Sequence, residues 1–322
     1  MKSFFCLTIS RYPDIVIYMK IVSYFKALAD DTRLRLVHLF LHYELNVNEI
    51  VSIMGMGQSR ISRHLKILVD TGLLTFRRDG LWTFYSAVNQ GEAHDFIESI
   101  TYLFQLESTY AKDLENAVRL LERRSEEATL FFDAIAEDWE KLKREIFGDI
   151  PLNNFILDIL PVSGTIVDMG CGTGDLLEAL KTKANDLIGV DKSPRMLETA
   201  CRRFADDGDH IQLRLGQLEH LPLRDGEADL AVINMVLHHL PEPIKAIKEA
   251  HRVLKKDTPF IIVDLQQHNQ EIMRERYGDR WLGFSTDELE RWLGHCGFYI
   301  KKTSYFDLKK NLKGFIITSV KR

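Results

Sequence analysis

Residues 165–174 of this chain read Thr165-Ile166-Val167-Asp168-Met169-Gly170-Cys171-Gly172-Thr173-Gly174, a short apolar run that ends in an acid and enters a glycine-rich turn. The apolar run is typical of a buried strand. Glycines at every second position let the backbone of the turn approach a ligand closely. A helix is expected directly after the turn, from about Asp175 to Lys183.

A second strand is expected at Leu187-Ile188-Gly189-Val190, and it ends in Asp191 with Lys192 beside it. A strand, a glycine turn, a helix and a second strand ending in an acid form a nucleotide-binding βαβ unit. The carboxylate of Asp191 can accept hydrogen bonds from two ribose hydroxyls.

The rest of the C-terminal half continues the alternation of strands and helices. Strands are expected at 229–233 and 260–264, helices at 243–254 and 286–294, and two further β-rich runs near 298–306 and 314–320. This order predicts an α/β, Rossmann-like, seven-stranded sheet with one antiparallel edge strand.

The spacing D-x-G-x-G-x-G resembles motif I of class I S-adenosylmethionine-dependent methyltransferases, and the resemblance spans about 152–320. It implies S-adenosylmethionine as cofactor, with S-adenosylhomocysteine as product or effector. Residues 216–223 look like the family's adenine-contacting segment, although Gln217 stands where the family more often has Asp. The resemblance implies these cofactor-binding residues: Asp168, Gly170, Cys171, Gly172, Gly174, Asp191, Lys192, Gln217, Leu218 and Asn234.

Two neighbouring histidines, His238 and His239, follow the expected strand at 229–233. Methyl transfer needs alignment of the acceptor and, if the acceptor is protonated, a base, because the cofactor brings the reactivity. One of the two histidines is therefore a candidate catalytic base. Helix capping or packing is the alternative for both. No metal site is predicted.

The N-terminal part predicts a winged helix-turn-helix within a mainly helical domain. Helices are expected from Val22, from Asp31 and around Ile50, followed by a Gly55-Met56-Gly57 corner and a further helix with Ile61, Leu65 and Leu68 on one face. Two β-rich runs around Asp79-Gly80 then predict a hairpin.

Polar and basic side chains lie on the opposite face of the helix that follows the corner, and two arginines lie beside the hairpin tip. Such a helix can enter the major groove of DNA, with the wing on the backbone or minor groove. A solvated face is the alternative for any single residue. The candidate DNA-binding residues are Gln58, Ser59, Ser62, Arg63, Lys66, Arg77 and Arg78.

Residues 22–90 strongly resemble the ArsR/SmtB family of bacterial repressors, through FKALADDTRLRLVHLF, QSRISRHLKILVDTGLL and RRDGLWTFYS. The resemblance implies a double-stranded DNA operator with a palindromic site and a homodimer. Members that sense soft metals carry cysteines where this chain has Asn46 and Asn48, which argues against thiolate sensing here.

The two halves are joined by helical sequence. Residues 92–127 are expected to form one long amphipathic helix, and a second apolar segment runs from Phe131 to Ile146. We therefore expect a DNA-binding domain at 19–90, a helical dimerisation and linker region at 91–150, and a methyltransferase domain at 151–322. Residues 1–18 are expected to be an unstructured extension.

Composition restricts the setting. No apolar run approaches the roughly 20 residues of a membrane helix, and the four cysteines show no paired spacing, so a cytoplasmic protein with no membrane partner is expected. Residues 19–90 hold 9 Lys and Arg against 6 Asp and Glu, a charge of +3, whereas 91–322 carry −9. The basic part is the domain expected to meet phosphate.

Two functions follow from these motifs. The first is a transcriptional regulator whose fused domain senses S-adenosylmethionine or S-adenosylhomocysteine, with a small-molecule methyl acceptor as a further ligand. The second is an active small-molecule methyltransferase whose DNA-binding domain only controls its own expression. Arsenite methylation ranks below both, because it normally needs several thiolates near the acceptor.

Overall fold

The computed structural model describes residues 13–104, 108–148, 152–157, 164–207 and 210–322. The chain divides into two compact units, Met1–Glu122 and Arg123–Arg322. The division lies inside the helical region 91–150 that was expected to join the two halves. Residues 91–150 are thus shared between the two units rather than set apart from both.

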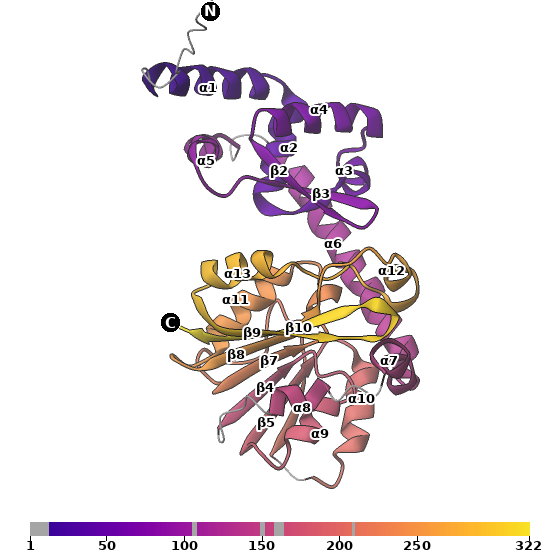
Figure 1. Ribbon diagram of the computed structural model, residues 1–322. Helices are drawn as coiled ribbons and strands as arrows, with labels where there is room; N and C mark the ends of the chain where they lie inside the picture. The colour runs from indigo at the N-terminus through magenta and orange to yellow at the C-terminus, as the bar shows by residue number, and fades with distance from the viewer. Residues whose placement is uncertain (1–12, 105–107, 149–151, 158–163, 208–209) are drawn as a thin grey trace, which may run out of the picture. The chain divides into compact units, whose positions relative to one another are not determined.

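The first unit is mainly helical, with a three-stranded antiparallel sheet of order β1-β3-β2. Its elements, labelled in Figure 1, are α1 Pro13–Leu28, α2 Asp31–His42, β1 Leu45–Asn46, α3 Val47–Met54, α4 Gln58–Asp70, β2 Leu74–Asp79, β3 Trp82–Ala87, α5 Glu92–Phe104 and the start of α6 Ser108–Ile135.

Local capping fixes the helix-turn-helix α3–α4. Asn46 accepts from the Glu49 backbone N–H at 3.1 Å while the Glu49 carboxylate accepts from the Asn46 N–H at 2.6 Å, a reciprocal capping box. Asn46 therefore caps the start of α3. The comparison of this position with the cysteines of metal-sensing repressors did not reveal that role. α3 ends at Gly55, whose φ of 64° suits glycine.

The predicted hairpin forms between β2 and β3. Asp79 pairs with Trp82, so that Gly80 and Leu81 make a two-residue loop in which Gly80 has a φ of 58°. The core beneath it contains Leu36, Leu39, Ile61, Leu65 and Leu68, all buried.

Two expectations for the first unit are wrong. Residues 13–18 belong to α1 and are not an unstructured extension, while residues 1–12 lie outside the described residues. The expected single helix over 92–127 is two elements, because α5 ends at Phe104 and α6 begins at Ser108.

The second unit is an α/β layer structure built on a seven-stranded sheet of order β6-β5-β4-β7-β8-β10-β9. Helices α11 and α13 lie on one side of the sheet and α8, α9 and α10 on the other (Figure 1). Beyond the end of α6, the elements are α7 Trp139–Phe147, α8 Leu152–Leu157, β4 Thr165–Met169, α9 Asp175–Leu180, β5 Asp186–Asp191, α10 Pro194–Arg203, β6 Ile211–Leu215, β7 Leu230–Asn234, the short 3-10 helix η1 Leu237–His239, α11 Pro243–Val253, β8 Pro259–Leu265, α12 Ile272–Tyr277, α13 Thr286–His295, β9 Phe298–Asp307, η2 Lys309–Asn311 and β10 Lys313–Lys321.

The antiparallel strand was expected at the edge of the sheet, and this expectation is wrong. β10 is antiparallel to both β8 and β9 and lies between them, so β9 forms the edge. The last hairpin therefore inserts its second strand next to β8.

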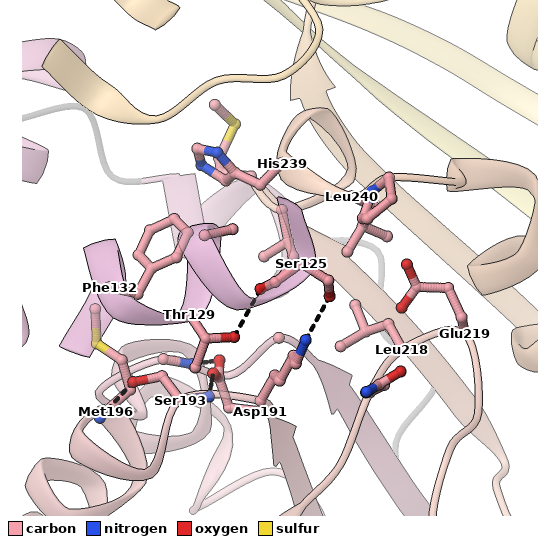
Figure 2. Close-up of a pocket in the computed structure, with 18 of the residues that line it drawn as sticks. Ser125, Thr129, Phe132, Asp191, Ser193, Met196, Leu218, Glu219, His239 and Leu240 are labelled. Carbon is pink, nitrogen blue, oxygen red and sulfur yellow. Dashed lines mark hydrogen bonds between the residues drawn. The ribbon is translucent and has the colours of Figure 1, made fainter. Parts of the chain in front are cut away.

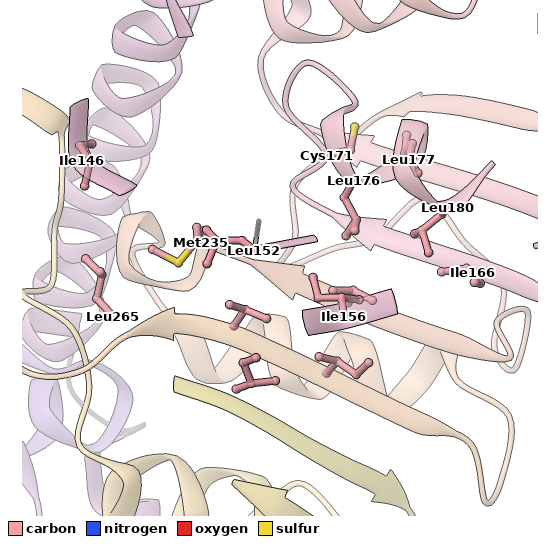
Figure 3. Packing of buried hydrophobic residues seen from close by; sticks show 14 of the residues in the cluster. Ile146, Leu152, Ile156, Ile166, Cys171, Leu176, Leu177, Leu180, Met235 and Leu265 are labelled. Atoms are coloured by element: carbon pink, nitrogen blue, oxygen red, sulfur yellow. The ribbon is translucent and has the colours of Figure 1, made fainter. Parts of the chain in front are cut away.

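The core of the second unit lies along the sheet (Figure 3). Ile146 from α7 packs in the same cluster as Ile166, Leu177 and Val263. The second apolar segment of the sequence, from Phe131 to Ile146, thus contributes to the core of this unit.

Candidate functional site

A pocket opens at the carboxyl ends of β4, β5 and β7, where open α/β sheets bind ligands. It holds about 760 Å³ of empty space, part of it open to solvent. Its lining, entirely from the second unit, is Ser125, Ala128, Thr129, Phe132, Trp139, Gly170, Gly172, Asp191, Lys192, Ser193, Met196, Gln217, Leu218, Glu219, Met235, Val236, His239, Leu240 and Pro241.

Asp191 stands at the end of β5, and two backbone groups fix its carboxylate. One oxygen accepts from the Gly172 N–H at 2.8 Å and the other from the Ser193 N–H at 2.9 Å. Burial raises the pKa of Asp191, while these hydrogen bonds oppose the rise. Each oxygen retains a lone pair for a further donor such as a ribose hydroxyl.

The glycine turn after β4 lies close to the side chain of Val236 on one side. A Cβ on Gly170, whose φ is 87°, would lie 2.7 Å from the Val236 side chain, so only glycine fits. A Cβ on Gly172 would meet nothing nearer than the Trp139 indole nitrogen at 3.9 Å. Open space therefore lies directly over the backbone at Gly172.

The end of α6 forms one wall of the pocket (Figure 2). Lys192 donates to the Ser125 hydroxyl, and Ser193 donates to Asp133 at 2.5 Å. Phe132 projects from the same helix toward the pocket. The loop that carries Asp191 is thus bonded to α6.

Six of the ten predicted cofactor-binding residues line the pocket: Gly170, Gly172, Asp191, Lys192, Gln217 and Leu218. The other four, Asp168, Cys171, Gly174 and Asn234, are absent from its lining. Cys171 packs in the hydrophobic core, and a Cβ on Gly174 would lie 2.5 Å from the Phe204 ring. Those two positions serve packing.

Asp168 lies beneath the glycine turn and is 2% exposed. Burial, followed by the charges of Asp191 and Asp175, raises the pKa of Asp168 to about 8. Asp168 therefore contributes a carboxyl group behind the pocket rather than a lining contact. Asn234, at the end of β7, donates to Asn153 at 3.5 Å.

The two histidines occupy different surroundings. His238 is buried, and its Nδ1 lies 2.6 Å from Asp264 Oδ1 and its Nε2 3.8 Å from Asp279. His239 lines the pocket, and its Nδ1 lies 3.1 Å from the Gly278 carbonyl oxygen. Only His239 is placed to meet a ligand directly.

Ligand atoms of His238, His239 and Asp279 lie within 4.8 Å of one another, a spacing at which a metal ion could be considered. The Nδ1 of His239 faces the Gly278 carbonyl and must carry a hydrogen to bond to it, so it has no lone pair for a metal. An ion-pair network between His238 and the two aspartates explains the cluster better.

The predicted DNA-binding face has two kinds of residue. On α4, Gln58, Ser59, Ser62, Arg63 and Lys66 are exposed, whereas His64 is buried. Arg77 is engaged inside the unit: its guanidinium lies 2.6 Å from Glu44 and 3.7 Å from Asp79, and over the Phe84 ring. Arg78 on the same strand is exposed.

Sequence reasoning missed several residues that the fold brings to these surfaces. Arg60 is exposed on α4 between two predicted residues, and its position on the helix was a usable signal. Ser125, Thr129, Phe132 and Trp139 carried no such signal, because nothing in their spacing relates them to a loop more than 30 residues away.

Two family profiles match the chain. The profile described as "Bacterial regulatory protein, arsR family" matches residues 30–75, and the one described as "Methyltransferase domain" matches residues 167–262. The chain carries an ArsR-family helix-turn-helix domain and a class I S-adenosylmethionine-dependent methyltransferase domain.

The methyltransferase domain is similar to proteins of several activities. A demethylmenaquinone methyltransferase of Lactiplantibacillus plantarum is 32% identical over 114 residues, 34% of this chain and 48% of that protein. An arsenite methyltransferase of Halobacterium salinarum is 32% identical over 107 residues, 32% of this chain and 27% of that protein. The chain spans about half the length or less of such relatives.

Solved structures support the fold. A chain from the Haloferax volcanii complex between the Trm112 methyltransferase activator and a putative methyltransferase superposes with a TM-score of 0.51 at 20% identity. That alignment covers 59% of this chain and 96% of the other. Across the described residues, none of the helices of this protein combines the length and apolar character that a bilayer crossing requires.

The pocket fits S-adenosylmethionine, the cofactor of this enzyme class. The residues present could hold it: open space lies over Gly172, the Asp191 carboxylate is oriented to accept further hydrogen bonds, and the Gln217 amide lines the same pocket. When bound, this cofactor supplies a methyl group on a positively charged sulfur.

Proposed function

We propose that this protein is an ArsR-type transcriptional regulator whose methyltransferase domain senses S-adenosylmethionine or S-adenosylhomocysteine and changes operator affinity. One observation carries the proposal: a single helix, α6, contributes to both units. Asp113 and Ala117 near its start are buried in the first unit, and Ser125, Thr129 and Phe132 near its end line the cofactor pocket.

The start of α6 is held by charge-assisted bonds. Arg35 of α2 donates to both oxygens of the buried Asp113 carboxylate, at 2.7 and 2.8 Å, and Asn116 donates to the Ile53 carbonyl of α3 at 3.1 Å. A ligand that changes the contacts of Ser125 or Phe132 therefore acts on a helix whose other end packs with the helix-turn-helix.

In this proposal Asp191 binds the ribose and Gln217 with Leu218 contact the adenine. Gly170 and Gly172 leave room for the rest of the cofactor, and Asp168 acts from behind them. Lys192 keeps Ser125 of α6 near the loop that would meet the ribose.

Double-stranded DNA is the proposed partner of α4 and the wing. Exposed Gln58, Ser59, Ser62, Arg63, Lys66 and Arg78 are the proposed contacts, with Arg60 added because it shares their face. A homodimer is supported by apolar side chains left exposed on α1 and α5, which are Ile21, Phe25, Tyr102 and Leu103.

The second candidate function is an active small-molecule methyltransferase whose DNA-binding domain only controls its own expression. His239 in the pocket favours it. The acceptor's electron pair would form the new bond to the methyl carbon, the electron pair of the carbon–sulfur bond would stay on sulfur, and His239 would take the acceptor's proton. Sensing and catalysis are compatible, since S-adenosylmethionine and its product S-adenosylhomocysteine differ by one positive charge, which a binding site can distinguish.

Arsenite is a poor acceptor for this pocket. Of the described cysteines, Cys171 and Cys296 are buried, Cys201 is exposed, and none lines the pocket. The lining near His239 is instead apolar, with Phe132, Met235 and Leu240.

The test uses titration calorimetry followed by DNA-shift assays with the full chain. Calorimetry with S-adenosylmethionine and S-adenosylhomocysteine measures whether the pocket binds either ligand. DNA-shift assays, with a duplex selected by the protein from random sequence, then compare operator affinity without ligand and with each one. Operator affinity that is the same in all three conditions would rule out sensing and leave the second candidate.

A further inference from the structure

The buried cluster beside the pocket is built around η1 and the loop that follows α12. The His238 carbonyl accepts from the backbone N–H groups of Arg280 and Trp281, both at 3.0 Å, and the Trp281 indole donates to the Leu240 carbonyl at 2.8 Å. These bonds tie the loop to η1. The two histidine rings are consequently fixed by backbone as well as by side chains.

His238 lies between two buried carboxylates. Asp264, which is fully buried on β8, places Oδ1 2.6 Å from Nδ1 and accepts from the Leu265 N–H with the same oxygen. Asp279, also buried, faces Nε2 at 3.8 Å. A buried carboxylate needs a cation nearby, and the imidazolium form of His238 supplies one positive charge that the two aspartates share.

His239 is fixed in one tautomer. The Gly278 carbonyl can only accept, so the hydrogen lies on Nδ1 and the lone pair on Nε2. The His238 ring is 4.0 Å away between centroids, and the Phe132 ring of α6 meets the His239 ring edge-on at 4.8 Å. Both neighbours disfavour a second positive charge at His239, one by its charge and the other by excluding water.

We propose that Asp264 and Asp279 are positioning residues, which hold His238 as a buried imidazolium against His239 and thereby keep His239 neutral, with Nε2 as the proton acceptor of the pocket. This inference rests on the proposed role of His239 as the base. It assigns the two histidines of the sequence to different tasks: His238 remains charged throughout, and His239 takes and returns the proton.

The pKa values of His238 and His239 agree with a charged His238 and a neutral His239. Burial lowers the pKa of His238, but Asp264 and Asp279 outweigh it and bring the value to about 9. Burial first, and then the charge of His238, lower the pKa of His239 well below its usual range, against the bond to Gly278. Asp279 is a further charged group near that ring, 3.9 Å from His239 Nδ1, and the charge of His238 also acts on His268, whose pKa is lowered by burial first and then by that charge.

The test is nitrogen NMR of the full chain labelled at histidine, with and without S-adenosylhomocysteine, which needs neither acceptor nor DNA. The signals are assigned with His239→Gln and His238→Gln. At pH 7 the wild-type chain should show His238 protonated on both nitrogens and His239 protonated on Nδ1 alone. A neutral His238, or a His239 with its hydrogen on Nε2, would overturn the proposal.

Asp264→Asn gives the second readout. Without that carboxylate His238 should lose its proton at a lower pH, and the midpoint of His239 protonation should move up by at least about one pH unit, a tenfold change in proton affinity. A purely structural aspartate would leave the His239 midpoint in place. Asp279→Asn should likewise lower the pH at which His238 loses its proton, and this His238 midpoint is the readout if Asp264→Asn fails to fold, because Asp279 also lies 3.9 Å from His239 Nδ1.

Asp257→Asn is the matched control, because Asp257 is an exposed carboxylate of the same unit outside the cluster and its φ of 61° is tolerated by Asn. It should leave both histidines unchanged. Absence of S-adenosylhomocysteine binding would contradict the proposed function but not the histidine assignments. Wrong proton states in a chain that binds the ligand would contradict this inference alone.

Discussion

The carboxylate of Asp191 carries the most specific chemistry of the pocket. Asp191→Ala removes the acceptors proposed for ribose and also the partners of the Gly172 and Ser193 N–H groups. We expect the free energy of S-adenosylhomocysteine binding to weaken by about 1.5–3 kcal/mol, roughly 10- to 150-fold in Kd. Titration calorimetry measures it. Asp186→Ala, at the exposed start of the same strand, should bind normally. Unchanged affinity in folded Asp191→Ala would remove Asp191 from the site.

Asp168 gives a prediction on pH. Its pKa is raised by burial, and then by Asp191 and Asp175, to about 8, against about 3.9 in an unfolded chain. Between these values the folded state holds a proton that the unfolded state has lost, so the contribution of Asp168 to the free energy of unfolding falls as pH rises from about 4 to about 8.

Asp168→Asn cannot ionise and keeps the shape of the protonated acid, so it should remove this part of the pH dependence. The advantage of the variant over the wild type in urea midpoint should therefore be larger at about pH 8 than at about pH 5. Urea unfolding of both proteins at the two pH values measures it. An advantage of the same size at the two pH values would show that Asp168 is already ionised in the folded chain at pH 5.

At the scale of elements, the arginines of α4 and of the β2–β3 wing differ in their contacts. Arg63 is exposed on α4, whereas Arg77 on β2 is bonded to Glu44 within the unit. We expect Arg63→Ala to lower affinity for a selected duplex and to reduce the salt slope by about 1. Arg77→Ala should instead destabilise the ArsR-type domain by about 1–3 kcal/mol and leave the slope unchanged.

Salt-dependent binding and thermal unfolding of the two variants measure these effects. Lys66→Ala is a useful companion, because its charge is shared with Asp70 at 2.8 Å and its effect on the slope should be smaller than that of Arg63. If Arg77→Ala reduced the salt dependence of DNA affinity as much as Arg63→Ala does, Arg77 would be a DNA contact.

How much the sequence predicted depended on whether the signal was local. The helix-turn-helix, the hairpin and the β4-glycine-β5 unit follow from spacing over a few residues, and all three were predicted. The position of β10 between β8 and β9 was not, because strand order is decided by pairing rather than by periodicity. The wall formed by Ser125 and Phe132 joins segments about 60 residues apart, which no short motif encodes.

Cys171 and Gly174 show a further limit. Both belong to the predicted glycine motif, yet one side chain packs in the core and the other position is a glycine because Phe204 leaves no room. A motif of alternating residues includes positions that hold the turn as well as positions that meet the ligand, and only the fold separates them.

At the scale of the whole molecule, α6 is one continuous helix across the division between Glu122 and Arg123. Its first half is anchored by Asp113 in the DNA-binding unit and its second half lines the cofactor pocket. A helix whose one end contacts the ligand can shift an equilibrium at its other end only by the difference in ligand affinity between the two states.

We therefore expect the two ligands, DNA and cofactor, to be coupled by about 1–3 kcal/mol, which changes operator affinity roughly 5- to 150-fold. Linkage requires saturating operator to change the affinity for S-adenosylmethionine or S-adenosylhomocysteine by the same factor, and calorimetry with and without the duplex measures it. Arg123→Gly weakens the helix at the division by about 1 kcal/mol relative to Arg123→Ala, so coupling should fall in the glycine variant and persist in the alanine one. Equal cofactor affinities with and without DNA, for both ligands, would contradict sensing and leave two functions joined in one chain.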